Sequence, residues 1–229
     1  MYQASSELTK KAMAGFAALS VVMGLVLFLC AGTLRYPEGW LFLGVFLGAS
    51  LGITLYLMKN DPKLLASRVR VGPIAEKRLR QKLIQLLASG TFLAALAIPA
   101  LDRRFSWSHV PLPFVMLGDF LIVAGFSIVL WVFKENSFAA STIEVGADQK
   151  LIDTGPYAWV RHPMYAGALP LLAGIPLALG SWWGLLTLMP FIAMLILRVL
   201  DEEALLRKEL SGYDAYCQRT HYRLFPHVW

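Results

Sequence analysis

Two charged segments interrupt an otherwise apolar chain, and their side chains could bind a small charged molecule. The first is Arg161-His162-Pro163, which comes directly before a long apolar run. Proline is favoured in the first turn of a helix. Arg161, His162 and the free backbone N–H groups of the helix start would therefore form a pocket that attracts anions. The alternative is a polar cap whose arginine extends to a membrane surface.

The second charged segment is Asp201-Glu202-Glu203, which we expect at the end of another apolar run. Three adjacent carboxylates repel one another, and the C-terminal end of a helix disfavours negative charge. A cationic ligand or an arginine partner would relieve this repulsion. The alternative is a solvated acidic patch on a helix that continues through Leu210. Opposite charges at the two ends of one helical hairpin would suit a zwitterionic ligand.

The composition identifies the broad class of the protein. Of the 229 residues, 57% are hydrophobic and 16% are charged, whereas soluble domains carry about 25% charged residues. This excludes a disordered chain, a collagen-like repeat and a disulfide-rich secreted module, and it indicates a polytopic membrane protein. The net charge of +6 comes from basic residues that flank apolar runs, so we expect membrane lipids rather than nucleic acid as the partner. Cys30 and Cys217 have no metal-ligand spacing, and we expect no metal site.

Six apolar runs are predicted to be membrane helices, because backbone groups in lipid must form their hydrogen bonds within the segment. The runs are Met13–Ala31, Trp40–Met58, Leu83–Leu101, Pro113–Phe133, Met164–Leu179 and Trp182–Leu197. Gly180 and Ser181 join the last two so tightly that they must form a helical hairpin. The predicted fold is all-α, with about six spans, this C-terminal hairpin and cytoplasmic segments that bind a cofactor.

The basic residues also predict an orientation. Of the 21 lysines and arginines, 18 fall on the side that holds both termini and the loop 59–82. Loops rich in lysine and arginine stay in the cytoplasm, so we expect both termini there, with the protein in a bacterial inner membrane. We divide the chain into residues 1–133, with four helices and this basic loop, and residues 134–229, a catalytic region. The catalytic region holds the hairpin 164–200 and a cytoplasmic C-terminal segment.

The order and spacing of the polar motifs carry a family resemblance. Residues 155–167 read Gly-Pro-Tyr-x-x-Val-Arg-His-Pro-x-Tyr-x-Gly, residues 202–206 read Glu-Glu-x-x-Leu, and Gly212-Tyr213-Asp214-Ala215-Tyr216 follows. This pattern resembles the isoprenylcysteine carboxyl methyltransferase family, and the related phospholipid N-methyltransferases are similar. The resemblance covers roughly Gln149–Trp229.

The resemblance implies methyl transfer from S-adenosylmethionine within a helical membrane fold. Arg161 and Glu203 would be the catalytic residues, with Arg161 toward the acceptor. The residues implied in cofactor binding are Lys150, Leu151, Gly155, Tyr157, His162, Tyr165, Glu202, Glu203 and Tyr213. Carboxylates suit the ammonium or ribose hydroxyls of this cofactor, His162 suits its carboxylate or a ring edge, and aromatic rings suit the adenine or the sulfonium. We expect Tyr157, Trp159, Tyr213 and Tyr216 among those rings.

The resemblance leaves the methyl acceptor open. We expect a lipophilic or membrane-delivered molecule, such as an isoprenylcysteine-like carboxylate, a phospholipid amine or a small thiol. A carboxylate is already ionised at neutral pH and needs no base, and Arg161 could position it. An amine or thiol must lose a proton, and either His162 or Glu203 could accept it.

Two other functions fit parts of the pattern. Membrane sterol and steroid reductases, which use NADPH, have a similar Arg-His-Pro-x-Tyr segment, but they usually have asparagine where this chain has Met164. A non-enzymatic scaffold or transporter would leave the clustered motifs unexplained. Asp119 lies inside the fourth apolar run, far from these motifs, and we expect it to be a structural or interfacial residue.

Overall fold

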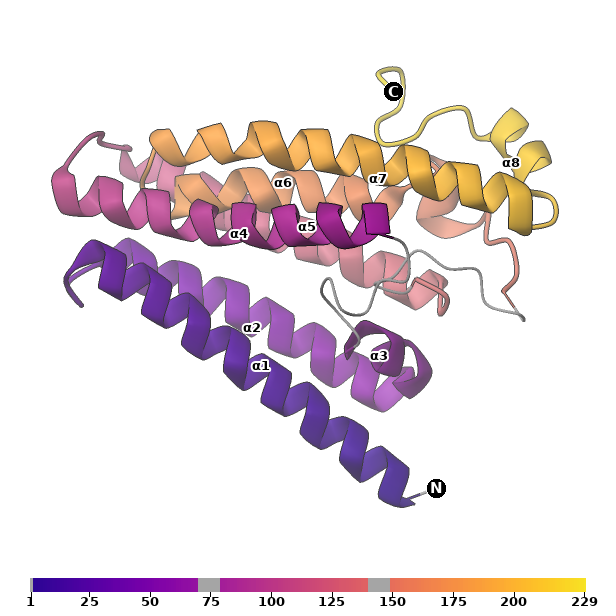
Figure 1. Cartoon of the computed structure of the whole chain (residues 1–229), viewed down its shortest axis with the longest axis horizontal. Helices are drawn as coiled ribbons and strands as arrows, with labels where there is room; N and C mark the ends of the chain where they lie inside the picture. The colour runs from indigo at the N-terminus through magenta and orange to yellow at the C-terminus, as the bar shows by residue number, and fades with distance from the viewer. Residues whose placement is uncertain (1, 70–78, 140–148) are drawn as a thin grey trace.

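The chain is helical wherever its structure is described. The computed structural model describes residues 2–69, 79–139 and 149–229, and no strand occurs among them. The elements are α1 (Tyr2–Ala31), α2 (Pro37–Asn60), α3 (Pro62–Val69), α4 (Leu79–Phe105), α5 (Leu112–Glu135), η1 (Gly155–Ala158), α6 (Pro163–Ala178), η2 (Trp183–Thr187), α7 (Leu188–Glu209) and α8 (Tyr213–Arg219). The predicted all-α class is confirmed (Figure 1).

Five helices among the described residues are long and apolar enough to cross a membrane. They are α1, α2, α4, α5 and the continuous η2–α7 segment, with mean hydropathies from 1.8 to 2.4. The sequence predicted six spans, and the remaining predicted run forms α6, which has only 16 residues. At 1.5 Å per residue a helix of that length is about 24 Å long, less than the ~30 Å of a bilayer core.

The helices differ from the predicted boundaries at two places. The helix that carries Asp201, Glu202 and Glu203 does not end there but continues to Glu209. Its last turn instead holds Arg207 and Lys208, the charge that a C-terminal helix end favours. In the predicted loop 59–82, α2, α3 and α4 occupy most of the described positions, and residues 70–78 lie outside the described part of the chain.

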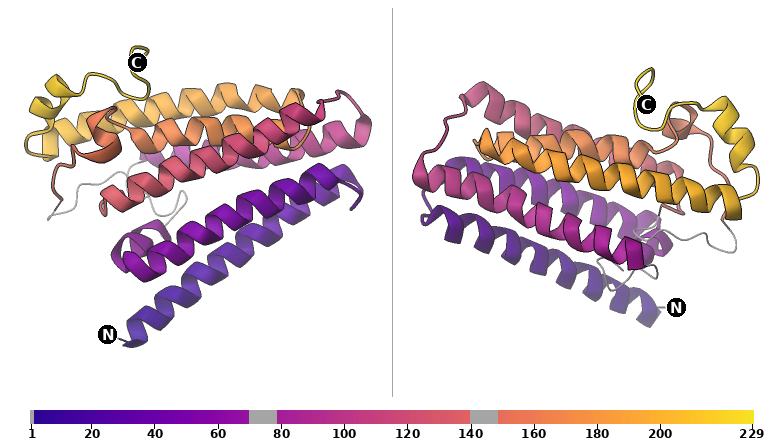
Figure 2. Two further views of the ribbon diagram at one scale, coloured as in Figure 1. Left: turned by 180° about the vertical axis from the view of Figure 1, so that it is seen from behind. Right: turned by 45° about the horizontal axis from the view of Figure 1, so that its top comes forward.

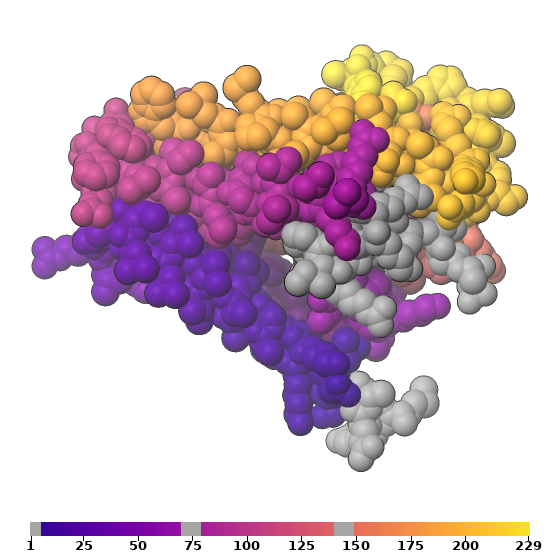
Figure 3. All heavy atoms as spheres, in the orientation of Figure 1, coloured from indigo at the N-terminus to yellow at the C-terminus, as the bar shows by residue number. Residues whose placement is uncertain are grey.

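The helices form a bundle with an N-terminal pair on one side. In Figure 1, α4 to α7 run side by side, and α1 and α2 lie beneath them. The left view of Figure 2 shows α1 diverging from the bundle toward its N-terminus. Apolar side chains such as Val21, Leu25 and Leu29 are exposed along α1, which covers one outer face of the molecule in Figure 3. An exposed apolar helix face of this kind is expected where lipid is the solvent.

The closest helix pair is α5 with α6. A Cβ atom added at Gly125 would lie 2.6 Å from the carbonyl oxygen of Gly167, so only glycine allows this approach. Gly118 meets the backbone of Ala178 in the same way farther along the pair. Small residues let helix backbones pack closely within a membrane. The start of α6, which carries the conspicuous His162–Pro163 sequence, is therefore positioned by α5.

The opposite end of the bundle is held by a buried carboxylate. Asp102 of α4 accepts hydrogen bonds from the backbone N–H of Ser108 at 2.7 Å and from the hydroxyl of Ser181 at 2.5 Å. Ser181 belongs to the turn between α6 and α7, as predicted, and Gly180 beside it has a φ of +72°. The Tyr36 hydroxyl donates to the carbonyl oxygen of Leu179. These bonds fix the hairpin turn against α2 and α4.

Candidate active site

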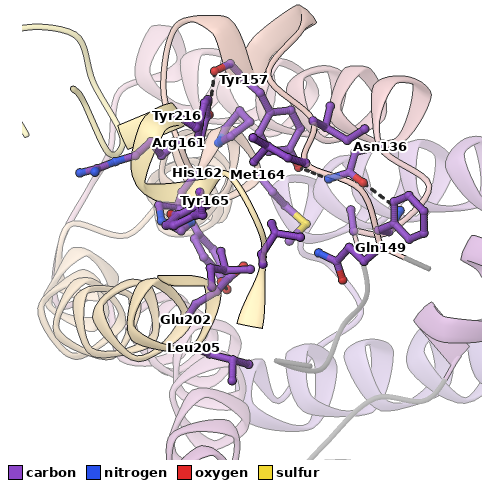
Figure 4. Close-up of a pocket in the computed structure, with 18 of the residues that line it drawn as sticks. Asn136, Gln149, Tyr157, Arg161, His162, Met164, Tyr165, Glu202, Leu205 and Tyr216 are labelled. Atoms are coloured by element: carbon purple, nitrogen blue, oxygen red, sulfur yellow. Dashed lines mark hydrogen bonds between the residues drawn. The ribbon is translucent and has the colours of Figure 1, made fainter. Parts of the chain in front are cut away.

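A cavity lies at the end of the bundle where the polar motifs meet. It is lined by the residues after α5, by residues 149–152, by η1, by the start of α6, by the C-terminal half of α7 and by the first half of α8. Its volume is about 850 Å³ including the open mouth. Figure 4 shows Asn136, Tyr157 and Tyr216 on one side, Glu202 and Leu205 on the other, and His162 and Tyr165 between them.

The structure brings together most of the residues that the sequence singled out. Those that line the cavity are Lys150, Leu151, Tyr157, Arg161, His162, Tyr165, Glu202 and Tyr213. They come from segments up to 63 positions apart in the chain, between Lys150 and Tyr213. Gly155 and Glu203 are not among the lining residues.

Gly155 has a conformational role beside the cavity. Its φ is +56°, and an added Cβ atom would lie 2.8 Å from the carboxylate of Glu135. The hydroxyl of the preceding residue, Thr154, donates a hydrogen bond to the same carboxylate. Glycine therefore allows the tight turn that begins η1, and η1 places Tyr157 on the cavity wall.

Glu203 lies directly behind the cavity wall and organises its cationic side. Its side chain is 3% exposed, and its Oε1 atom lies 3.2 Å from Nε of Arg161 and 3.3 Å from Nε2 of His162. Nε of Arg161 has no aligned hydrogen-bond partner among the described residues, so that contact is an ion pair rather than a hydrogen bond. The other oxygen, Oε2, accepts from Nε of Arg223 at 3.1 Å. Removing one partner from such a buried cluster costs about 3–5 kcal/mol.

The C-terminal segment holds the same residues through the backbone. The N–H of Arg161 donates to the carbonyl oxygen of Tyr222, and the N–H of His162 donates to that of Arg223, each at 2.9 Å. Arg223 thus supports the Arg161–His162 pair through both its backbone and its guanidinium. The sequence pattern did not predict Arg223 as a site residue.

A second polar network connects the cavity to α4. Tyr165 donates to Oε2 of Glu202 at 2.7 Å and accepts from Nε of Arg198 at 3.1 Å. Arg198 also donates to the side chain of Gln81 at 3.0 Å, and Gln81 donates to Asp201 at 2.5 Å. Gln81 is fully buried. The sequence pattern did not predict Arg198 and Gln81 as site residues. The feature that could have indicated them is that each is a polar residue at the edge of an apolar run.

Aromatic rings form the remaining wall. Asn136 donates to the Tyr157 hydroxyl at 2.8 Å, and the Tyr216 hydroxyl donates to the Tyr157 carbonyl oxygen at 2.8 Å. Burial raises the pKa of Tyr157 to about 12, so this phenol stays protonated at physiological pH. The buried Tyr213 hydroxyl has no hydrogen-bond partner within the described residues. Trp159 is 68% exposed and does not form the wall that the sequence suggested.

Two sequence expectations concern groups away from this cavity. Asp119 is 6% exposed, and neither carboxylate oxygen has a hydrogen-bond partner among the described residues. Asp119 lies on α5, 17 residues before Asn136, which follows the end of this helix and lines the cavity. At 1.5 Å per residue this separation is about 25 Å, so Asp119 lies away from the cavity.

No cluster of three or more histidine, cysteine, aspartate or glutamate side chains suited to a metal ion occurs in the described ranges.

Comparison with known proteins identifies a domain that contains part of this site. The family model for phospholipid methyltransferase matches residues 113–211. Residues 113–211 form a phospholipid methyltransferase domain. Phospholipid methyltransferases use S-adenosylmethionine. The domain covers α5 to α7 and contains His162, Tyr165 and Glu202, whereas α1 to α4, α8 and Arg223 lie outside it.

A distant relative with a different activity also matches. The chain is 32% identical over 91 residues to a Delta(14)-sterol reductase of Mus musculus, which corresponds to 38% of this chain and 22% of the reductase. The chain thus spans less than a quarter of the length of the curated relative that it matches. This likeness to a membrane reductase is therefore partial and distant.

The side chains in the cavity are chemically suited to S-adenosylmethionine. Its carboxylate and ammonium need polar or oppositely charged partners, and the cavity is lined by the imidazole of His162 and the carboxylate of Glu202. The unpartnered Tyr213 hydroxyl offers one more hydrogen bond to a ligand. Aromatic faces of Tyr157 and Tyr213 suit the adenine or the sulfonium.

Proposed function

We propose that this protein transfers a methyl group from S-adenosylmethionine to a lipophilic acceptor at the membrane surface. The single observation that supports this most is the cavity that brings His162, Tyr165 and Glu202 together within residues 113–211, which match a phospholipid methyltransferase domain. These polar side chains suit the zwitterionic end of the cofactor. The adjacent membrane-spanning helices would give the acceptor access from the lipid.

Each lining residue has a proposed task. Glu202 would bind the ammonium or the ribose hydroxyls, and His162 the carboxylate or a ring edge. Tyr165 would hold Glu202 in position through their 2.7 Å hydrogen bond. The backbone at Lys150 and Leu151 would enclose the cofactor. Glu203 would act as a positioning residue, because its carboxylate is occupied by three cationic or ionisable side chains behind the wall.

When bound, S-adenosylmethionine would supply a methyl group, which a lone pair of the acceptor would take as the carbon–sulfur bond breaks and leaves its electron pair on sulfur. The protein contributes mainly by aligning the acceptor with this bond, a task that we assign to Arg161. A carboxylate acceptor needs no base. For an amine or thiol, His162 would accept the proton, because Glu203 is held in ion pairs.

We also propose the membrane orientation. With α6 as a short sixth crossing inside the bundle, both termini and the cavity lie on one side, as the arrangement in Figure 1 allows. The excess of lysine and arginine on that side favours the cytoplasm. A bacterial inner membrane would fit this arrangement.

The cofactor prediction is tested by binding to the purified chain in mild detergent. We expect calorimetry to detect S-adenosylmethionine and S-adenosylhomocysteine, and no heat from NADPH. The match to a Delta(14)-sterol reductase makes NADPH the relevant competitor. Binding of NADPH alone to the folded protein would replace the methyltransferase proposal with a reductase.

The role of Arg161 gives a separate prediction. Arg161→Ala should lower turnover by roughly 10- to 100-fold, the effect expected when one charge-assisted hydrogen bond of ~1.5–3 kcal/mol is lost. The dissociation constant of S-adenosylmethionine should change much less. Arg207→Ala is a matched control, because Arg207 pairs with Asp214 on the exposed surface nearby. Equal losses in turnover and cofactor affinity would reassign Arg161 to the cofactor.

A further inference from the structure

A second cavity lies between α1, α2, α3 and α5, next to the first. Its volume is about 1,020 Å³ including its opening. Of its 15 lining residues only Lys11 and Arg68 are charged, and both are basic. Three of its four walls lie outside residues 113–211, so the domain match does not account for it.

This cavity extends into the membrane-spanning part of the bundle. Its lining runs from Phe133 to Phe126 on α5 and from Leu57 to Ser50 on α2. Seven residues of helix rise about 10 Å, and both stretches lie within candidate spans. The Thr54 hydroxyl in this wall donates to the Ser50 carbonyl oxygen and so adds little polarity. A cavity of this depth and lining suits a hydrocarbon chain.

Arg68 connects the two cavities. Its guanidinium carbon lies 4.8 Å from the centre of the Phe133 ring, inside the second cavity. Its Nη1 atom donates to the carbonyl oxygen of Ala139 at 3.2 Å and lies 3.6 Å from the sulfur of Met164. Ala139 and Met164 both line the first cavity. A molecule whose chain fills the second cavity would therefore present its polar end between Arg68 and the proposed cofactor.

Arg68 brings a positive charge to this junction. Burial lowers the pKa of Arg68 to about 10, which still leaves the guanidinium protonated at neutral pH. The other basic lining residue, Lys11, lies on α1 and forms an ion pair with Glu7 at 2.7 Å. Arg68 contacts residues of both cavities, so it is the cation that a headgroup at their junction would meet.

We propose that the second cavity holds a hydrocarbon chain of the acceptor lipid, and that Arg68 binds an anionic oxygen of the acceptor headgroup. This rests on the proposed methyltransferase function and adds a binding site and a specificity-determining residue to it. Arg68 selects acidic headgroups, a phosphate diester or a carboxylate, over uncharged ones. A guanidinium forms two parallel hydrogen bonds with either group.

The test uses three lipids that carry a photoreactive diazirine in the chain: a phospholipid, a fatty acid and an uncharged long-chain alcohol. The full chain is labelled in membranes, and the labelled positions are mapped by mass spectrometry. We expect labelling on α1 between Ala12 and Leu19 and on α5 between Phe126 and Phe133. Whichever acidic lipid labels more strongly identifies the headgroup as phosphate or carboxylate.

Gly15→Leu fills the cavity, and Gly24→Leu is its matched control. A Cβ atom at either position meets open space, but only Gly15 lines the cavity. Gly15→Leu should lower cavity labelling by all three lipids about tenfold and raise the KM for the acceptor comparably, a change of ~1.4 kcal/mol. Gly24→Leu should match the unmodified chain.

Arg68→Gln separates the headgroup role from a structural one. We expect about tenfold less labelling by the acidic lipids, no change with the alcohol, and partial recovery in Arg68→Lys. Equal effects of Gly15→Leu and Gly24→Leu, or labelling outside this cavity, would overturn the chain site. Equal loss with acidic and uncharged lipids would overturn the role of Arg68. Calorimetric measurement of S-adenosylmethionine binding on the same preparations distinguishes the methyltransferase proposal from the lipid-site proposal. Failure to bind S-adenosylmethionine would count against the proposed function alone.

Discussion

Replacing Glu203 by glutamine should weaken cofactor binding and lower turnover while leaving most of the fold intact. Glutamine keeps the shape of the side chain but removes the charge that Arg161, His162 and Arg223 share. Breaking a buried ion cluster costs about 3–5 kcal/mol, and the loosened residues are those that face the cavity. We expect S-adenosylmethionine affinity to fall at least about tenfold and turnover at least about a hundredfold, since 1.4 kcal/mol corresponds to a factor of ten.

The control for this variant lies on the same helix. Glu209 is exposed at the end of α7, and Glu209→Gln should change neither binding nor turnover. Thermal unfolding in detergent, measured with each variant, separates a local effect from general destabilisation. Near-normal affinity and turnover in Glu203→Gln would show that the Glu203 cluster does not organise the site.

The comparison of Glu202 with Glu203 shows what the sequence alone could and could not predict. The adjacent carboxylates were predicted as a pair because their repulsion needs a partner, and both do have polar partners. Their directions differ because adjacent residues on a helix point about 100° apart. Glu202 therefore reaches the cavity and Tyr165, whereas Glu203 turns to Arg161 and His162 behind the wall.

The roles of other site residues could not be predicted from the sequence, because these roles depend on tertiary contacts. Gln81 lies at the start of α4, and nothing in its local sequence indicates that α7 will bury it against Arg198 and Asp201. Arg68 resembled one more basic residue of a cytoplasmic loop, but α3 turns its guanidinium back toward Met164. Helical periodicity and charge counting predict which segments enter the membrane, and they contain no information on which distant loop closes over which helix.

The close packing of α5 against α6 should be the structural feature of the domain that is most sensitive to substitution. A Cβ atom at Gly125 would lie 2.6 Å from both the Gly167 carbonyl oxygen and Cβ of Leu171. Because one of these atoms belongs to the backbone, Gly125→Ala forces the two helices apart, and overpacking of this kind costs about 1–3 kcal/mol or more. We expect a clearly lower unfolding temperature in detergent.

The same substitution should also disturb the proposed site, because α6 begins at Pro163, directly after His162. Separation of the helices would move His162 and Tyr165 away from Glu203 and Glu202, and we expect at least about tenfold weaker cofactor binding even well below the unfolding temperature, equivalent to ~1.4 kcal/mol. Gly44→Ala is the matched control, because an added Cβ atom there meets open space on α2. Unfolding temperatures that agree between the two variants would contradict close α5–α6 packing. A lower unfolding temperature with normal cofactor affinity would instead mean that the α5–α6 packing stabilises the bundle without positioning the site.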